Sequence, residues 1–220
     1  MGVRPLLMDI NMKVVTYMNN IHKIQQSIVY TALKFESNNE EGPNFCNYFK
    51  KFGFVLGKSK NESKKMCMDS YDRFWISKLT ESPKAIMFSK IKYNVSLEKY
   101  LYEIKNIRYK IALSRFRLSN HSLLIETGRY SRPKIERDDR KCFICKDEIE
   151  DEQHFVTKCP LYSEERKPLY KSLRNNSKFF DSLNTDQKFI FIMTNEDKNV
   201  MRQLGKFVFN SMKIRDKQFL

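Results

Sequence analysis

Four side chains that could bind a metal ion stand close together in this chain. Three of its five cysteines and one of its three histidines fall between Cys142 and Cys159. They form the pattern C-x2-C-x8-H-x4-C, with Cys142, Cys145, His154 and Cys159 as the candidate ligands. Cysteine and histidine at such spacings are typical zinc ligands, and two cysteines separated by two residues can hold one ion from a tight turn. The sequence therefore predicts a bound zinc ion.

The ligand count indicates what kind of zinc site this is. Four protein ligands leave no open coordination position, which is typical of structural rather than catalytic zinc. A redox-active C-x-x-C pair is disfavoured, because no βαβ pattern surrounds it and His154 and Cys159 would have no role. RING-type ubiquitin ligases need two ions and eight ligands, so that class is also disfavoured. An odd number of cysteines argues against a disulfide framework.

No enzymatic activity is predicted. A polymerase needs paired carboxylates to hold two metal ions, usually in an aromatic-x-Asp-Asp turn. The only such pair, Asp138–Asp139, lies in a basic linker without an aromatic residue two positions before it. No endonuclease constellation is visible either.

The charge of the chain predicts a polyanionic partner. A formal charge of +15 and a pI near 9.5 favour nucleic acid first and an anionic membrane surface second, although excess lysine can also be only a solvated surface. Residues 84–141 hold 15 Lys and Arg against 6 Asp and Glu, whereas residues 142–168 hold 4 against 7. The positive charge is therefore concentrated just before the cysteine cluster.

The basic residues before and around the first cysteine are the expected phosphate contacts. They are Lys105, Lys110, Arg117, Arg129, Arg132, Lys134, Arg137, Arg140 and Lys141. Phe143 could stack on a base or fill the small core of the zinc segment, whereas Phe155 is expected in that core. The acidic run KDEIEDE, residues 146–152, would repel phosphate. It is therefore expected to face away from nucleic acid or to dock against a basic helix of the same chain.

Hydrophobic periodicity predicts a mainly α-helical protein. Residues 186–193 are ambiguous between a helix and a buried strand. Helices are expected at Met12–Phe35, Phe45–Leu56, Ser63–Leu79, Lys84–Tyr93, Ser96–Ser119, Ser163–Leu173 and Glu196–Lys217.

The strongest helix prediction covers Ser96–Ser119. Ser96 is a favourable N-cap, and Leu97, Tyr100, Leu101, Ile104, Ile107, Ile111 and Leu118 fall on one stripe. Arg108 and Arg115 fall within that stripe, so they either pair with a buried acid or mark the edge of a groove open to phosphate.

The expected organisation has four parts. A helical N-terminal region covers residues 1–83, and a basic helical region with a linker covers 84–141. A zinc knuckle of a short hairpin plus a helical turn covers 142–162, and a C-terminal helical region covers 163–220. A chelator is expected to unfold residues 140–162 while much of the helical remainder survives.

The stretch FRLSNHSLLIETGRYSRPKIERDDRKCFICKDEIEDEQHFVTKCPLYSEER, Phe116–Arg166, resembles a known family. It is similar to the region that follows the reverse transcriptase domain in non-LTR (LINE-type) retrotransposon polyproteins. Shared features are an RLSxHxL-like phrase, a GR turn, C-x2-C, an IEDExHF-like stretch and CPxY. The resemblance implies a nucleic-acid-binding accessory region, with the four zinc ligands named above and an arginine-rich phrase of Arg115, Arg117, His121, Arg129 and Arg132.

The expected function is therefore binding of RNA or single strands, tolerant of sequence, by a zinc-stapled fragment derived from a retroelement and lacking its catalytic domains. A reverse transcriptase from the same element is a further expected partner. The alternatives are a zinc-stabilised protein-interaction module and a nonfunctional retrotransposon remnant. No run of about 18 apolar residues predicts a membrane span, and no secretory signal is recognised, so an intracellular location is expected, nuclear or cytoplasmic.

Overall fold

The computed structural model describes Lys13 and residues 59–218, and these residues are mainly helical. Within this part of the chain there is no β-strand, and no helix is long and apolar enough to cross a membrane. Apart from Lys13, the predicted helices at 12–35 and 45–56 lie outside the described residues. The chain divides into two compact units. Among the described residues, the first unit contains 60–78 and 94–96, and the second contains Leu79–Tyr93 and the chain from Leu97 onward.

Helix α4, Lys60–Glu81, confirms the helix predicted at 63–79. It begins where Ser59 and Glu62 exchange hydrogen bonds between side chain and backbone, at 2.9 and 3.3 Å. Such a reciprocal pair satisfies two amides that the first turn leaves without helical partners. Cys67 on this helix is buried.

The long helix predicted at Ser96–Ser119 is wrong, because the chain breaks it in two. Helix α6 covers Tyr100–Glu103, and α7 covers Ile107–Arg117. Asn106 starts the second helix, since its Oδ1 accepts hydrogen bonds from the amides of Arg108 and Tyr109 at 2.9 and 3.4 Å. An asparagine side chain that binds these amides favours a new helix start over continuation. Ser96 caps neither helix, and its hydroxyl donates to Asn94.

The break also changes which side chains reach the core. Tyr100 and Ile104 from the predicted stripe are buried, whereas Leu97, Ile107 and Ile111 are exposed. Arg108 and Arg115 are exposed as well, so neither occupies a buried position on this face. A single helical period cannot run through two helices with different axes.

The predicted linker before the cysteines is folded back on itself. It follows α8, Leu124–Thr127, and contains a cis peptide bond before Pro133 and a 3-10 turn at Arg137–Asp139. The amide of Ile135 donates to the carbonyl of Gly128 at 3.1 Å. The basic segment, residues 128–141, is therefore a structured loop.

Three helices follow the metal-ligand segment. Helix α10, Ser163–Asn176, confirms the predicted helix there despite Pro168, and α12, Lys198–Gln218, confirms the closing helix. The ambiguous residues 186–193 belong to α11, Thr185–Thr194. A capping box of Asn184 and Gln187 fixes the start of α11, which hydrophobic pattern alone could not decide.

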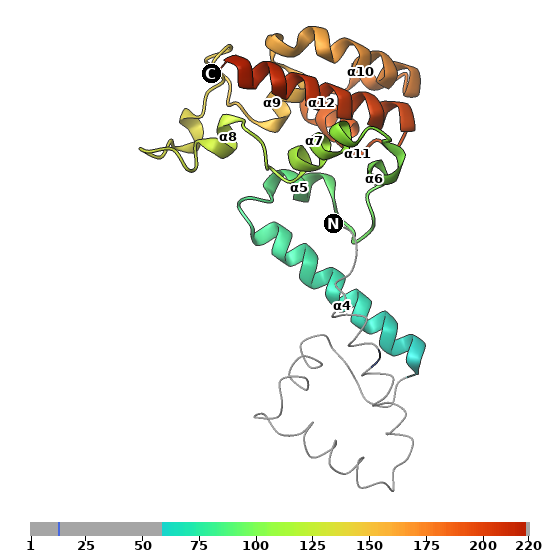
Figure 1. Ribbon diagram of the computed structural model, residues 1–220. Coiled ribbons are helices and arrows are strands. Elements are labelled where there is room, and N and C mark those ends of the chain that lie inside the picture. Colours follow the sequence, from blue (N-terminus) through green and yellow to red (C-terminus); the bar gives the residue numbers. More distant parts are fainter. Residues whose placement is uncertain (1–12, 14–58, 219–220) are drawn as a thin grey trace, which may run out of the picture. The chain divides into compact units, whose positions relative to one another are not determined.

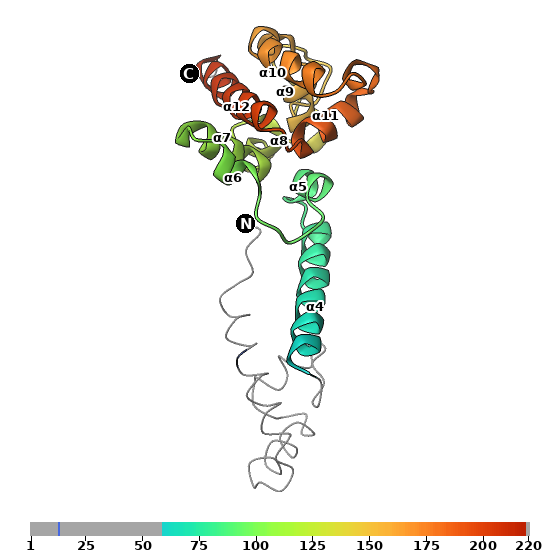
Figure 2. The ribbon, with the colours of Figure 1, turned by 90° about the vertical axis from the view of Figure 1, so that its right-hand side faces the viewer.

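Helix α12 is the centre of the second unit. It packs against α7 and α10, which lie on either side of it in Figure 1 and Figure 2. Gly205 permits a close approach, because an added Cβ there would lie 3.2 Å from Ile104 Cδ1 and from Tyr109 Cβ. Smaller elements complete the unit: α5 at Ile86–Ile91, α9 at Glu152–Thr157, and 3-10 turns at Pro160–Tyr162 and Phe180–Ser182.

Candidate metal centre

The fold brings the four predicted ligands together. The donor atoms of Cys142, Cys145, His154 and Cys159 all lie within 4.8 Å of one another. The Sγ atoms of Cys142 and Cys159 are 3.8 Å apart. In a tetrahedron with zinc–sulfur bonds of about 2.3 Å, two sulfurs are about 3.8 Å apart. The cluster therefore has the composition and the spacing to hold a metal ion.

A tight turn presents the first two cysteines. The amide of Lys146 donates to the carbonyl of Cys142, and the amide of Asp147 donates to that of Cys145, each at 2.7 Å. Lys146 adopts the left-handed conformation, with φ of 62°. Lys141 and Ile149 form one isolated antiparallel bridge around this turn. The predicted hairpin is thus limited to a single bridge, without strands in the residues described.

Helix α9 positions the other two ligands. Asp151 caps its first turn, since Oδ1 accepts a hydrogen bond from the His154 amide at 2.8 Å. The helix ends before Pro160, and the Cys159 amide donates to the carbonyl of His154 at 2.9 Å. This confirms the expected helical turn between the two ligands.

The environment of His154 suits metal binding. Both ring nitrogens are buried, and neither has a hydrogen-bond partner among the described residues. Nδ1 lies 3.6 Å from a carboxylate oxygen of Glu148, which Lys158 holds with two contacts of 2.8 Å. Burial lowers the pKa of His154, which favours the neutral imidazole that coordinates metals. A bound ion would supply the missing partner of a buried nitrogen.

The thiols of Cys145 and Cys159 resist ionisation when no cation accompanies them. Burial and the neighbouring cysteines raise the pKa of Cys159 to about 12, and burial also raises the pKa of Cys145. Three thiolates this close repel one another, so a cation is needed to stabilise them. Metal binding and deprotonation are therefore coupled at this site.

The ligand segment shares its core with the helices. Phe155 is fully buried, and its ring centre lies 5.4 Å from that of Phe116, 4.6 Å from Tyr162 and 5.4 Å from Phe207. This confirms that Phe155 is a core residue. Arg166 on α10 donates to the carbonyls of Val156, Phe155 and Cys159, at 2.7, 3.2 and 2.9 Å. These bonds fix the C-terminal end of α9 to α10.

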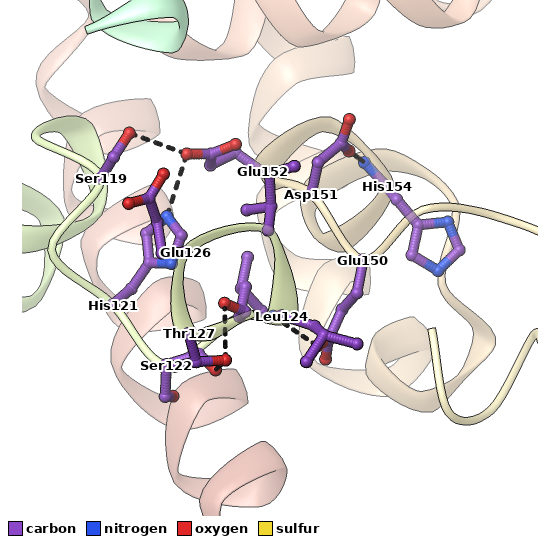
Figure 3. A network of polar contacts seen from close by, with 12 residues as sticks. Ser119, His121, Ser122, Leu124, Glu126, Thr127, Glu150, Asp151, Glu152 and His154 are labelled. Atoms are coloured by element: carbon purple, nitrogen blue, oxygen red, sulfur yellow. Dashed lines mark hydrogen bonds and ion pairs between the residues drawn. The ribbon is translucent and has the colours of Figure 1, made fainter. Parts of the chain in front are cut away.

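Two carboxylates of the acidic run, Glu150 and Glu152, are buried and engaged by other parts of the chain, whereas Asp147 is exposed. Arg215 on α12 donates to both carboxylate oxygens of Glu150 at 3.0 and 2.8 Å, and the Leu124 amide donates to the same carboxylate at 2.7 Å. Ser119 and His121 contact Glu152 Oε1 at 2.9 and 3.0 Å (Figure 3). Both carboxylates point toward α8 and its neighbours, away from the His154 ring (Figure 3). Glu150 thus docks against Arg215 on α12, in agreement with one of the two expectations, and the orientation of the run relative to nucleic acid stays a prediction.

Two predicted phosphate contacts are wrong. Arg117 is only 4% exposed, and its guanidinium donates to the carbonyl of Met193 and to Glu98. Arg140 is 5% exposed and donates to the carbonyls of Ile125 and Ile135. Both guanidiniums satisfy buried acceptors, so they are not available to a phosphate.

The remaining predicted contacts lie at or near the surface. Phe143 is 63% exposed, so the alternative that places it in the core is wrong. Arg129 is partly exposed and contacts Glu126 and the carbonyl of Pro83, and Lys110 is partly exposed as well. Among the predicted contacts, the exposed cations are Lys105, Arg132, Lys134, Arg137 and Lys141.

Three residues that lie beside the basic segment were not predicted from the sequence. Lys84, Lys90 and Tyr130 line a groove together with Arg129, Lys134 and Arg137. Lys84 and Lys90 are distant from the cysteines in sequence and come from the segment around α5. Tyr130, in the phrase GRYSR, was the only one with a local signal, an aromatic residue between two arginines.

No family model, curated protein or solved structure matches this chain. The likeness to non-LTR retrotransposon proteins therefore remains a prediction. The proposed function therefore rests on the geometry of the site.

Proposed function

We propose that the four-ligand cluster binds a structural zinc ion in a CCHC knuckle. Three sulfur donors and one imidazole within 4.8 Å of one another favour zinc over magnesium or calcium, which prefer oxygen ligands. The closed ligand set predicts a structural role. The unpartnered ring nitrogens of His154 support this proposal.

We further propose that the zinc-stabilised module binds RNA or single-stranded DNA with little sequence preference. The observation that carries the proposal is an imbalance of charge at the surface. Glu150 and Glu152 are buried against Arg215 and His121, whereas Arg132, Lys134, Arg137 and Lys141 of the basic segment are exposed. An exposed cationic surface from which these two acidic side chains are withdrawn is suited to a phosphate backbone.

Zinc contributes by fixing the end of the basic segment. The amide of Glu150 donates to the carbonyl of Arg140 at 2.8 Å, so the chain before Cys142 is hydrogen-bonded to the chain after the turn. The Arg140 side chain then ties Ile125 to Ile135. The metal-holding turn and this arginine together hold the exposed cations in one conformation, which lowers the entropy lost on binding. No catalytic role is proposed for the chain.

The test measures binding of the zinc-loaded full chain to a fluorescent single-stranded oligonucleotide across a salt series. The logarithm of the binding constant should fall linearly with the logarithm of salt concentration. Reversing Arg132, Lys134 and Arg137 to Glu should reduce that slope by about two, at about 0.7 per lost phosphate contact on a single strand.

A triple variant of equal charge change provides the matched control. Lys171→Glu, Lys178→Glu and Arg202→Glu alter exposed residues outside the basic segment. This control should lose less affinity and keep more of the salt slope. Absence of binding even at low salt would contradict the proposal and favour a zinc-stabilised protein-interaction module.

A further inference from the structure

A groove of about 440 Å³ lies beside the basic segment, within the second unit. Six cationic and three acidic side chains line it. The cations come from the chain around α5 and from the basic segment, and they are Lys84, Lys90, Arg129, Lys134, Arg137 and Arg140. The groove is large enough for a small organic ligand and has a positive balance of charge.

The groove also offers apolar and aromatic surface. Met87, Ile125 and Phe189 line it and are themselves buried. Tyr130 lines it as well, with 71% of its surface exposed. An exposed aromatic ring among cations is typical of sites that stack an unpaired base while neighbouring residues contact phosphate.

One acidic group in the groove has an open hydrogen-bonding position. Glu126 is 5% exposed, and its Oε1 pairs with Arg129 at 3.2 Å. Its Oε2 is buried and has no hydrogen-bond partner among the described residues. The other two acids are already engaged, Asp151 by the His154 amide and Glu152 by Ser119 and His121. A buried acceptor without a partner is costly, so a ligand that donates to it gains affinity.

We infer that this groove holds one unpaired nucleotide of a bound single strand, with its base on Tyr130 and its amino group donating to Glu126. The inference rests on the proposed nucleic-acid binding and adds a base preference to it. Lys84, Lys134 and Arg137 would contact the adjoining phosphates. Adenine, cytosine and guanine carry an exocyclic amino group, whereas thymine and uracil offer only N3–H between two carbonyl oxygens that a carboxylate repels.

The first test compares oligo(dC) and oligo(dT) of equal length at one salt concentration, using the zinc-loaded full chain. Phosphate number and ring size are matched, and the bases differ at C4, at N3 and by the thymine methyl group; the C4 amino group of cytosine is the donor that Glu126 would accept. Wild type should prefer oligo(dC) by about tenfold, as expected for one hydrogen bond to a charged group. Glu126→Gln should remove most of this preference, because an amide can also donate to the thymine carbonyl.

The second test uses variants at exposed positions, where substitutions have little effect on folding. Tyr130→Ala should weaken binding by about tenfold, while Tyr130→Phe should retain it. The pair Lys84→Glu and Lys90→Glu should weaken binding more than the pair Lys171→Glu and Lys178→Glu on and after α10. Circular dichroism and metal content confirm that each variant is folded.

The outcomes separate this inference from the proposed function. If no oligonucleotide binds at low salt, both are overturned. If oligonucleotides bind without a preference for oligo(dC), or if the groove variants behave like the Lys171 and Lys178 control, the groove assignment is wrong and the proposed function stands. If cytidine monophosphate binds as tightly as oligo(dC), the groove is a mononucleotide site and its assignment to a strand is wrong.

Discussion

At the scale of single residues, the candidate metal centre depends on burial of its donors. Cys142, His154 and Cys159 are almost completely buried, and Cys145 is partly exposed. Burial raises the pKa of Cys145 and of Cys159 and lowers the pKa of His154, which favours the neutral ring. The same environment that disfavours free thiolates protects a formed metal–thiolate cluster from solvent.

Replacing one ligand should release the metal. Cys159→Ser is expected to lower zinc content well below the roughly one ion per chain expected for a single four-ligand site, because serine is a poor zinc ligand. Plasma emission spectrometry on the purified chain measures this content. Cys67→Ser is the matched control, since Cys67 is a buried thiol outside the cluster. Equal zinc in the Cys159→Ser and Cys67→Ser variants would contradict the assignment.

Metal binding should release protons. The pKa values of Cys145 and Cys159 are raised, so these thiols are protonated at pH 7, whereas the lowered pKa of His154 leaves its ring neutral. Zinc binding at pH 7 should therefore release protons from Cys145 and Cys159, and the affinity should rise with pH. Titration calorimetry in buffers of different ionisation enthalpy counts these protons. Release of none would show that thiolates do not bind the ion.

At the scale of elements, one buried ion pair joins the ligand segment to α12. Glu150 and Arg215 are about 6% exposed and share two hydrogen bonds. Glu150 also accepts from the Leu124 amide, so the same carboxylate contacts α8 and α12. Arg166 adds the corresponding connection to α10.

Removing one partner of this pair should be costly. Arg215→Met is expected to lower the free energy of unfolding by about 3–5 kcal/mol, because it leaves the Glu150 carboxylate buried without its cation. Urea denaturation of the zinc-loaded chain measures this. Adding Glu150→Gln to Arg215→Met should restore part of the loss. Arg174→Met, which breaks the exposed pair with Asp181, is the control and should have little effect. A similar loss in both single variants would contradict a special role for the buried pair.

At the scale of the whole molecule, the metal centre and the helices of the second unit share one core. Phe155 and Val156 lie between the ligands His154 and Cys159 and are completely buried. A knuckle with a separate core would unfold alone on chelation, as the sequence suggested. The shared core instead couples loss of the metal to the packing of α7, α10 and α12.

Chelation is therefore expected to destabilise the whole unit. Removing zinc should lower its melting temperature by roughly 10 °C or more, given the binding energy of structural zinc. Hydrogen exchange followed by mass spectrometry should show lost protection in α7, α10 and α12 as well as in residues 140–162. Loss confined to residues 140–162 would show that the knuckle is independent. Re-addition of zinc, but not of magnesium, should restore protection.

The sequence predicted a helix correctly where the hydrophobic periodicity was clear over the whole segment. The segments at 163–173 and 196–217 have clear periodicity, and the structure forms helices there. The long helix at 96–119 was mispredicted because Asn106 is compatible with a helix interior by periodicity, while its side chain favours a cap. The chain ends α6 at Ile104's neighbour Glu103, and Ile104 is buried close to Gly205 of α12. This contact between distant segments is not visible in the local sequence.

The sequence by itself determined the four residues of the candidate metal centre, because donors at such spacing along a short segment are brought together by a local turn and helix. It could not determine which arginines reach solvent. Arg117 and Arg140 are chemically identical to Arg132 and Arg137, yet the first two satisfy buried carbonyls and a carboxylate contributed by other segments. Only the tertiary structure decided this, since burial is set by contacts between residues far apart in sequence. Other contacts between distant segments bury Glu150 against Arg215 and bring Lys84 and Lys90 into the groove that Tyr130 lines.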